Sequence, residues 1–231
     1  MIKVASYNIH KGIGLDRRRD PRRILEVLRE IDADIIALQE ADRRFGARLC
    51  VIDPQLLDDH SPWKAVAIGD RSGSMGWHGN ALLVRKNARV LASNIIHLPA
   101  LEPRGAVVAD VDNAGALVRV VGMHLDLSGL RRRRQAHSIM SHVHADEAGH
   151  PTVMMGDLNE WSAHAGCLRD FGHHFRFAAT GPSFHVRRPV AALDRIMHTP
   201  DLRVLDCGVH SSACSRRASD HLPIWAVLES H

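Results

Sequence analysis

The feature that most constrains the fold is a long run without a helical pattern, between Asn80 and Leu125. Four strand-like segments follow one another there, separated by turn residues: 80–84, 90–98, 106–111 and 117–125. Consecutive strands without crossover helices pair antiparallel, because a parallel pair needs a much longer connection. The run therefore predicts two packed sheets rather than one doubly wound parallel sheet.

The first part of the chain predicts a strand, a helix and a second strand. Residues 2–9 have a strand-like pattern, and Asp20-Pro21 then resembles an N-cap followed by the first helical residue. Apolar residues recur after it at helical spacing, which predicts an amphipathic helix. Residues 33–38 are continuously apolar and predict a strand buried on both faces.

That second strand ends in an acid, Glu40. A carboxylate at the end of a buried strand either pairs with a cation or binds a metal ion, because an isolated buried charge is costly. The residues alone leave both fates open.

A similar strand end lies at residues 152–161, where an apolar run reaches Gly156-Asp157-Leu158-Asn159. Side chains two positions apart in extended chain point to the same side, so Asp157 and Asn159 can face one pocket. Asp157 can orient a water, accept a proton or reach a metal, and Asn159 can donate a hydrogen bond to an anionic oxygen. An ordinary Asx-type turn is the alternative.

Further polar residues interrupt the apolar pattern at strand ends or strand starts. Together with the two strand ends above, they form this set: Asn8, Glu40, His124, Asp157, Asn159, Asp194, Asp220 and His221. Acids and amides suit a hard, oxygen-preferring ion such as Mg²⁺. A histidine beside acids suits a general base near neutral pH. We therefore expect one site on a rim of loops above the sheets.

Six short segments in this order resemble the endonuclease/exonuclease/phosphatase superfamily, which has the DNase I-like fold. They are Tyr7-Asn8-Ile9-His10, Leu38-Gln39-Glu40, Gly122-Met123-His124-Leu125, Gly156-Asp157-Leu158-Asn159, Leu193-Asp194-Arg195-Ile196 and Ser219-Asp220-His221. The resemblance spans nearly the whole chain, so residues 1–231 are expected to form one domain. It implies a four-layer α/β/β/α sandwich of two mostly antiparallel sheets with helices outside. It also implies hydrolysis of phosphoester bonds with Mg²⁺, for which Mn²⁺ can substitute.

The resemblance implies a role for each site residue. Glu40 corresponds to the principal metal ligand, with Asn8 and Asp220 close to the ion. Small bacterial members of the superfamily resemble this chain around Asn80 and Arg104, which are the expected substrate contacts. Arg104 could instead pair with its neighbour Glu102.

The other positions correspond to groups that act on water and phosphate. His221 is the general base or holds the scissile phosphate, and Asp194 orients its imidazole. Asp157 and Asn159 position the attacking water and a phosphate oxygen, and His124 lies on the phosphate side. Which of Asp157 and His221 activates the water stays open.

The chain departs from the family pattern in two respects. Some nuclease members carry an acid two residues after the first asparagine, where this chain has His10. The chain is also short for the family, which leaves little room for extra loops that grip DNA.

Composition restricts location and partners more than it restricts chemistry. The net charge of +4 suits an anionic substrate, and 4% aromatic content disfavours a base-stacking platform for single strands. No apolar run approaches the roughly 18 residues of a membrane span, and the first residues lack a signal-peptide pattern. We expect a cytoplasmic monomer without stable membrane insertion and with reduced thiols. A zinc site at Cys207, His210 and Cys214 lacks a convincing fourth ligand.

These observations favour a phosphodiesterase that acts on nucleic acid. The alternative within enzymes is a phosphatase or phospholipase C-like hydrolase of a lipid head group or sugar phosphate. A third hypothesis is a non-catalytic, arginine-rich nucleic-acid-binding protein, although carboxylates beside phosphate argue against it. The arginines at 131–134 begin a predicted helix, where we expect a mostly solvated face. One arginine reaching the pocket is the alternative.

Overall fold

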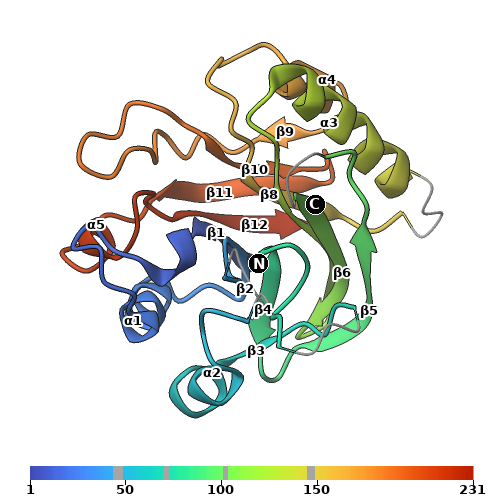
Figure 1. Cartoon of the computed structure of the whole chain (residues 1–231). Coiled ribbons are helices and arrows are strands. Elements are labelled where there is room, and N and C mark those ends of the chain that lie inside the picture. The colour runs from blue at the N-terminus through green and yellow to red at the C-terminus, as the bar shows by residue number, and fades with distance from the viewer. Residues whose placement is uncertain (44–48, 70–72, 101–103, 145–148, 231) are drawn as a thin grey trace.

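A computed structural model describes residues 1–43, 49–69, 73–100, 104–144 and 149–230. Within these ranges the strands form two sheets of six, which lie face to face with helices on the outside (Figure 1). The predicted four-layer sandwich is confirmed.

The first sheet has the order β11-β12-β1-β2-β4-β3. Its strands are β1 (Ile2–Asn8), β2 (Ile35–Gln39), β3 (Trp63–Ala65), β4 (Ala81–Arg85), β11 (Leu202–Val209) and β12 (Ile224–Ser230). The second sheet has the order β5-β6-β7-β8-β10-β9. Its strands are β5 (Arg89–Ile96), β6 (Gly105–Asn113), β7 (Ala116–His124), β8 (Thr152–Asp157), β9 (Arg176–Phe177) and β10 (Asp194–His198).

Helices cover the outer faces of the two sheets. The helical segments are the 3-10 turn η1 (His10–Gly12) and the helices α1 (Pro21–Ile31), α2 (Pro54–His60), α3 (Gly129–His144), α4 (Cys167–Gly172) and α5 (Ser215–Ala218). Asp20 caps α1 as predicted, because its Oδ1 accepts a hydrogen bond from the backbone N–H of Arg23 at 3.2 Å. Apolar side chains of α1 pack on the first sheet and those of α3 and α4 pack on the second.

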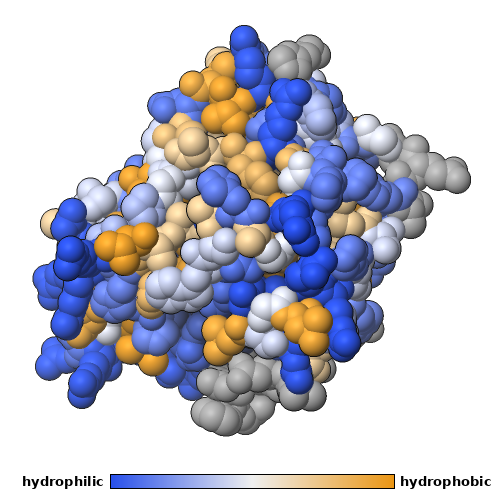
Figure 2. Space-filling view, turned by 90° about the horizontal axis from the view of Figure 1, so that it is seen from above, coloured by the Kyte–Doolittle hydropathy of each residue, from blue (hydrophilic) through white to orange (hydrophobic). Residues whose placement is uncertain are grey.

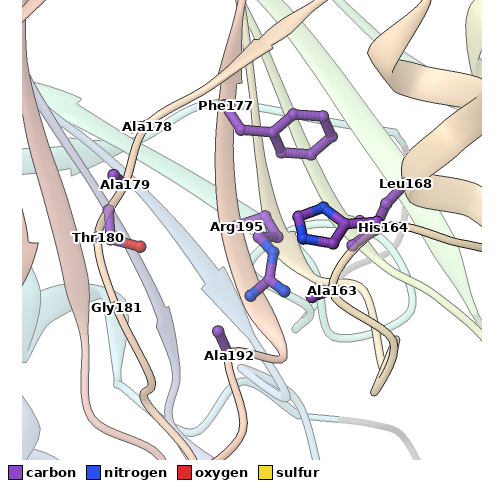
Figure 3. Close-up of a pocket in the computed structure, with 10 residues that line it drawn as sticks. All are labelled: Ala163, His164, Leu168, Phe177, Ala178, Ala179, Thr180, Gly181, Ala192 and Arg195. Atoms are coloured by element: carbon purple, nitrogen blue, oxygen red, sulfur yellow. The ribbon is translucent and has the colours of Figure 1, made fainter.

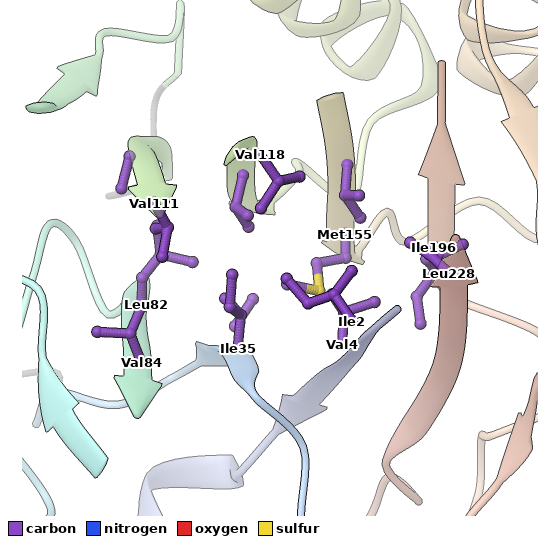
Figure 4. Close-up of a cluster of buried hydrophobic side chains, with 14 of the residues drawn as sticks. Ile2, Val4, Ile35, Leu82, Val84, Val111, Val118, Met155, Ile196 and Leu228 are labelled. Carbon is purple, nitrogen blue, oxygen red and sulfur yellow. The ribbon is translucent and has the colours of Figure 1, made fainter. Parts of the chain in front are cut away.

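The central core lies between the sheets (Figure 4). Alternation along the strands explains it: Val4 of β1 faces the second sheet, whereas Ala5 faces α1. In the same way Val107 of β6 faces inward, and Val108 packs with the helices outside. Strands buried on both faces account for the continuously apolar segments of the sequence.

The helix-free run forms β4 in the first sheet and the antiparallel series β5–β6–β7 in the second. The sequence also predicts short strands at 65–68 and 183–185, and both predictions are wrong. The strand in the first region is β3, at Trp63–Ala65, and the segment 183–185 makes only isolated bridges from Phe184 to Ala191 and to His221. In that second case the backbone of Ser183 and Phe184 bonds to Ala191 instead of continuing a ladder.

Two parallel strand pairs determine where the predicted site residues come together. β1 runs parallel to β2, with Asn8 opposite Gln39, and β7 runs parallel to β8, with His124 opposite Asp157. Their carboxyl ends therefore meet at one rim, where β10 begins with Asp194 opposite Asp157. Residues from both sheets can share a pocket there.

The face of the molecule seen in Figure 2 carries hydrophilic residues over most of its area, interrupted by hydrophobic patches. Of the helices in the described ranges, none has the length and apolar character to cross a membrane.

Candidate active site

Asp157 is the centre of the site and is 2% exposed. Asn8 Nδ2 donates to its Oδ2 at 3.0 Å, and the backbone N–H of Asn159 donates to its Oδ1 at 2.9 Å. Asn8 belongs to the first sheet and Asp157 to the second, so the bond between them joins the sheets. The preceding Gly156 is required for this approach, because a Cβ there would lie 1.8 Å from the carbonyl oxygen of Met123.

His221 is held on two sides. Its Nδ1 lies 2.9 Å from Asp194 Oδ2, which also accepts the Ser183 hydroxyl, and its Nε2 lies 3.8 Å from Asp157 Oδ2. The Phe184 ring packs against the imidazole at 4.7 Å between centroids. The ring is therefore fixed in orientation, and Nε2 is the nitrogen that faces the pocket.

Burial and neighbouring charges displace two pKa values in this group. Burial alone would lower the pKa of His221, but the charge and hydrogen bond of Asp194, assisted by Asp157, raise it to about 10. Burial raises the pKa of Asp157 to about 6, and the negative charge of Asp194 acts in the same direction. At neutral pH the resting site therefore holds a protonated imidazole beside a carboxylate that titrates near neutrality.

His124 lies on the other side of Asp157, with Nε2 at 3.4 Å from Oδ2. Arg104 Nη1 donates a hydrogen bond to the same nitrogen, so this ring accepts from a cation. Burial, followed by the charge of Arg104, lowers the pKa of His124 well below its ordinary value, which keeps the ring neutral. The alternative partner of Arg104, Glu102, lies outside the described residues.

Asn159 and Asn80, two of the predicted site residues, donate hydrogen bonds from their side-chain amides to backbone carbonyls. Asn159 Nδ2 donates to the carbonyl of Leu125 at 3.0 Å, and Asn80 Nδ2 donates to the carbonyl of Gly105 at 3.1 Å. The buried Oδ1 of Asn80 has no hydrogen-bond partner within the described structure. Both side chains thus stabilise the loops around the pocket.

Glu40 and Asp220 lie at the rim of the site, with side chains 24% and 28% exposed. The 3-10 turn η1 lies between them. Lys11 forms an ion pair with Glu40 Oε2, and His10 Nδ1 lies 3.8 Å from Asp220 Oδ1. Of the two fates considered for Glu40, the structure displays the pairing with a cation.

The donor set fits a divalent cation. Asp157, Asp194 and His221 present ligand atoms that lie within 4.8 Å of one another, and no other His, Cys, Asp or Glu group in the described ranges does so. The zinc hypothesis at Cys207, His210 and Cys214 therefore has no support. Asp194 Oδ1 is buried without a hydrogen-bond partner in that part of the chain, and Glu40 and Asp220 add partly accessible carboxylates at the rim. Oxygen ligands of this kind suit Mg²⁺ or Mn²⁺.

Sequence reasoning missed a buried ion pair beside the site. Arg132 is 7% exposed; its Nη2 donates to Glu160 Oε2 at 3.1 Å, and its Nη1 donates to the carbonyl of Leu127 at 2.6 Å. The predicted solvated face of residues 131–134 is thus wrong for Arg132, which ties the loop after β7 to the loop after β8. Glu160, three residues after Asp157, was the available signal, since a buried acid needs a partner.

An aromatic pair at the rim was also missed. Trp161 is 67% exposed, and its ring meets that of Phe184 edge to face at 6.0 Å between centroids. Phe184 in turn packs on His221. The position of Trp161 directly after Glu160 was a weak signal, because aromatic residues make up only 4% of this sequence.

Comparison with known proteins agrees with this fold. The chain is 27% identical over 248 residues to the uncharacterized protein YbhP of Escherichia coli K12. The aligned region covers 99% of this chain and 92% of YbhP. Among solved structures, the endonuclease/exonuclease/phosphatase from Bacteroides vulgatus superposes with a TM-score of 0.78 at 20% identity, covering 100% of this chain and 99% of that one.

Two further solved structures share the fold at lower identity. The mannosyl-6-phosphatase Bt3783 of Bacteroides thetaiotaomicron has a TM-score of 0.75 at 17% identity, covering 99% of this chain and 100% of that one. D. rerio TDP2, complexed with a single-strand DNA product, has a TM-score of 0.76 at 16% identity and covers 99% of each chain.

The model of the Endonuclease/Exonuclease/phosphatase family matches residues 5–221, a range that begins in β1 and ends at His221. It therefore includes every residue of the site described above. The chain belongs to the endonuclease/exonuclease/phosphatase family and is a phosphoester hydrolase.

Proposed function

We propose that the protein hydrolyses phosphodiester bonds of nucleic acid in a reaction that depends on Mg²⁺ or Mn²⁺. The observation that carries this proposal is the arrangement around Asp157. The Nε2 atoms of His221 and His124 lie 3.8 and 3.4 Å from one of its oxygens, and the Nδ2 of Asn8 donates to the same oxygen. Groups that hold a phosphate and move a proton thus converge on one point.

The cation would be held by Glu40 and Asp220, with Asn8 close by, rather than by Asp157, Asp194 and His221, which contact one another and would act on the water and the phosphate. It would neutralise charge on the phosphoryl oxygens when bound. Glu40 and Asp220 are accessible from the rim, which suits ligands that a cation reaches from solvent. The Lys11 ammonium occupies one carboxylate oxygen of Glu40 and has to leave it for the cation.

Protein groups then account for the remaining steps. Asp157, whose pKa is about 6, can take the proton of the attacking water, whereas the protonated His221 can hold the scissile phosphate and becomes a base only after losing its proton. Asp194 fixes the ring of His221 through Nδ1, so Nε2 is free to act on the substrate. Arg104 contacts His124 and can hold a phosphate oxygen beside that ring.

A nucleic acid substrate is supported by charge and by the rim. The chain carries a net charge of +4, which attracts a polyanion. Trp161 and Phe184 offer exposed aromatic surface beside His221, where a base or sugar next to the scissile phosphate can pack. TDP2 carries a DNA product on the same fold, whereas Bt3783 is a phosphatase, so the fold alone does not choose between diester and monoester.

A phosphoester panel tests the proposal. Plasmid DNA, RNA, bis-nitrophenyl phosphate, nitrophenyl phosphate, inositol phosphates and phospholipids are each incubated with Mg²⁺ or Mn²⁺, and with EDTA as the control. Turnover of diesters and nucleic acid that EDTA abolishes is expected. Hydrolysis of monoesters or lipid head groups alone, or turnover that survives full metal removal, would contradict it. Salt-sensitive DNA binding without turnover would instead support a non-catalytic binder.

A further inference from the structure

A cavity of about 450 Å³ lies next to the active site, on the opposite face of β10. Successive strand residues point to opposite faces, so Asp194 faces His221 while Arg195 enters this cavity (Figure 3). The cavity opens between the segment 177–181 and the loop 163–164. Its principal lining residues are His164, Leu168, Phe177, Thr180, Ala192 and Arg195.

Arg195 is a half-buried cation. Its Nη1 donates a hydrogen bond to the carbonyl of its neighbour Asp194 at 3.3 Å, and no carboxylate in the described ranges forms an ion pair with it. Glu160, the acid of the adjacent loop, forms its ion pair with Arg132 instead. Because a guanidinium carries five N–H donors in a planar fork, most of the donor capacity of Arg195 is available to a ligand.

The electrostatic state of Arg195 agrees with this view. Burial lowers the pKa of the guanidinium, although the charges of Asp194 and Glu160 act in the opposite direction. An arginine stays protonated nonetheless, and an anion in the cavity would offset the lost hydration.

The walls of the cavity are mostly apolar. Phe177 and Leu168 provide the larger hydrophobic side chains, and alanines cover much of the remaining surface. Ligand cavities of a few hundred Å³ with apolar walls and a few polar groups fix the orientation of a bound molecule through those groups. In this cavity the charged group is the guanidinium of Arg195, and the Thr180 side chain lies opposite it (Figure 3).

We propose that this cavity binds an amphipathic anion, whose charged head lies on Arg195 and whose apolar body lies against Phe177 and Leu168. The head is a carboxylate, phosphate or sulfonate, since each can accept two parallel hydrogen bonds from the guanidinium fork. The site is separate from the catalytic group because β10 lies between them, and it does not depend on the proposed reaction.

Two matched fluorescent probes test this site on the full chain. The dye 8-anilinonaphthalene-1-sulfonate carries an anionic head, and N-phenyl-1-naphthylamine has the same apolar body without it. Arg195→Gln should weaken binding of the sulfonate about 10- to 100-fold, the usual worth of a charged hydrogen bond, and leave the neutral probe within about twofold. Arg195→Lys keeps the charge and should retain much of the sulfonate affinity.

A second variant tests the location independently of the charge. Ala179 lines the cavity and is exposed, so Ala179→Trp can fill the space without disturbing the core, and it should weaken both probes. Arg89→Gln, an exposed arginine of β5, is the matched control and should change neither. The proposal is wrong if Arg195→Gln leaves sulfonate binding unchanged, if it weakens both probes equally, or if Ala179→Trp weakens neither. Thermal unfolding of each variant confirms that it is folded.

Discussion

Lys11 donates a hydrogen bond from its ammonium group to Oε2 of Glu40, and both residues hold left-handed backbone conformations, with φ of 57° and 55°. Such conformations are unfavourable for residues with a Cβ and persist where the surroundings enforce them. The structure thus holds a monovalent cation against the carboxylate to which the family resemblance assigns the divalent one.

Because Lys11 and the metal ion compete for Glu40, Lys11→Met should tighten Mg²⁺ binding to the resting protein. A partly exposed ion pair is worth up to about 1 kcal/mol, so the dissociation constant should fall by up to about fivefold. Isothermal titration with Mg²⁺ measures it. Lys86→Met is the control, because Lys86 pairs with Asp58 outside the site. Equal or weaker binding in Lys11→Met would mean that Lys11 does not oppose the ion.

Removal of the carboxylate itself should have the opposite effect. Glu40→Ala should weaken Mg²⁺ binding and leave little activity at any metal concentration, whereas Glu40→Gln retains one oxygen ligand and should be partly rescued by excess metal. Titration calorimetry and diester turnover measure the two effects. Unchanged metal affinity in Glu40→Ala would remove Glu40 from the ligand set.

His221 and Asp194 should act as one unit, since Asp194 Oδ2 holds His221 Nδ1 at 2.9 Å. His221→Ala should keep Mg²⁺ affinity near that of the wild type and lose about 10²–10⁴-fold in kcat, the usual worth of a positioned acid or base. The double variant with Asp194→Asn should be hardly slower than His221→Ala alone. Ser183→Ala controls for the second bond to Asp194. Fully additive losses would give Asp194 an independent role, such as binding the metal ion.

The raised pKa of Asp157 predicts how stability depends on pH in metal-free protein. The value rises from 3.8 to about 6 on folding, mainly through burial, so the folded state favours the protonated acid. This contribution to the free energy of unfolding is fully present below pH 3.8 and is lost as the pH rises through about 6. Denaturant unfolding in EDTA should therefore show wild type losing stability relative to Asp157→Asn across that window. Parallel curves for the two proteins would show that the pKa of Asp157 is not raised.

The buried pair Arg132–Glu160 predicts a large effect on stability. Arg132→Leu leaves the Glu160 carboxylate buried without its cation, which costs about 3–5 kcal/mol. Arg134→Leu, two residues along the same helix, should stay within about 0.5 kcal/mol, because Arg134 is exposed. Urea denaturation of the two variants measures the difference. Similar values for both would show that the pair contributes no more than a surface contact.

Much of the fold follows from local pattern. The cap at Asp20, the buried strand before Glu40 and the series of strands from Ala81 to His124 each depend on residues that are close in sequence. β3 was misplaced because only three residues pair with β4, and burial of Trp63 rather than alternation sets its position.

The site residues that belong to family motifs could be predicted from the sequence, whereas the residues around the neighbouring cavity could not. The motifs brought Asn8, Asp157, Asp194 and His221 to one pocket, as the structure has them. They could not indicate that Arg195 enters a cavity without an acidic partner, since this depends on which side chains arrive from distant loops. The metal ligands Glu40, Asn8 and Asp220 stay predictions.

The hydroxyl of Ser219 donates to the backbone carbonyl of Asn8 across 211 positions of sequence. Two strands that flank this bond, β1 and β12, are neighbours in the first sheet. A growing polypeptide therefore lacks His221, and the hydroxyl that donates to the Asn8 carbonyl, until residues 219–221 have been synthesised. Loop closure over such a separation also makes the pairing slow to form. The candidate active site is thus incomplete until residue 221 has been synthesised, however early its first strand is made.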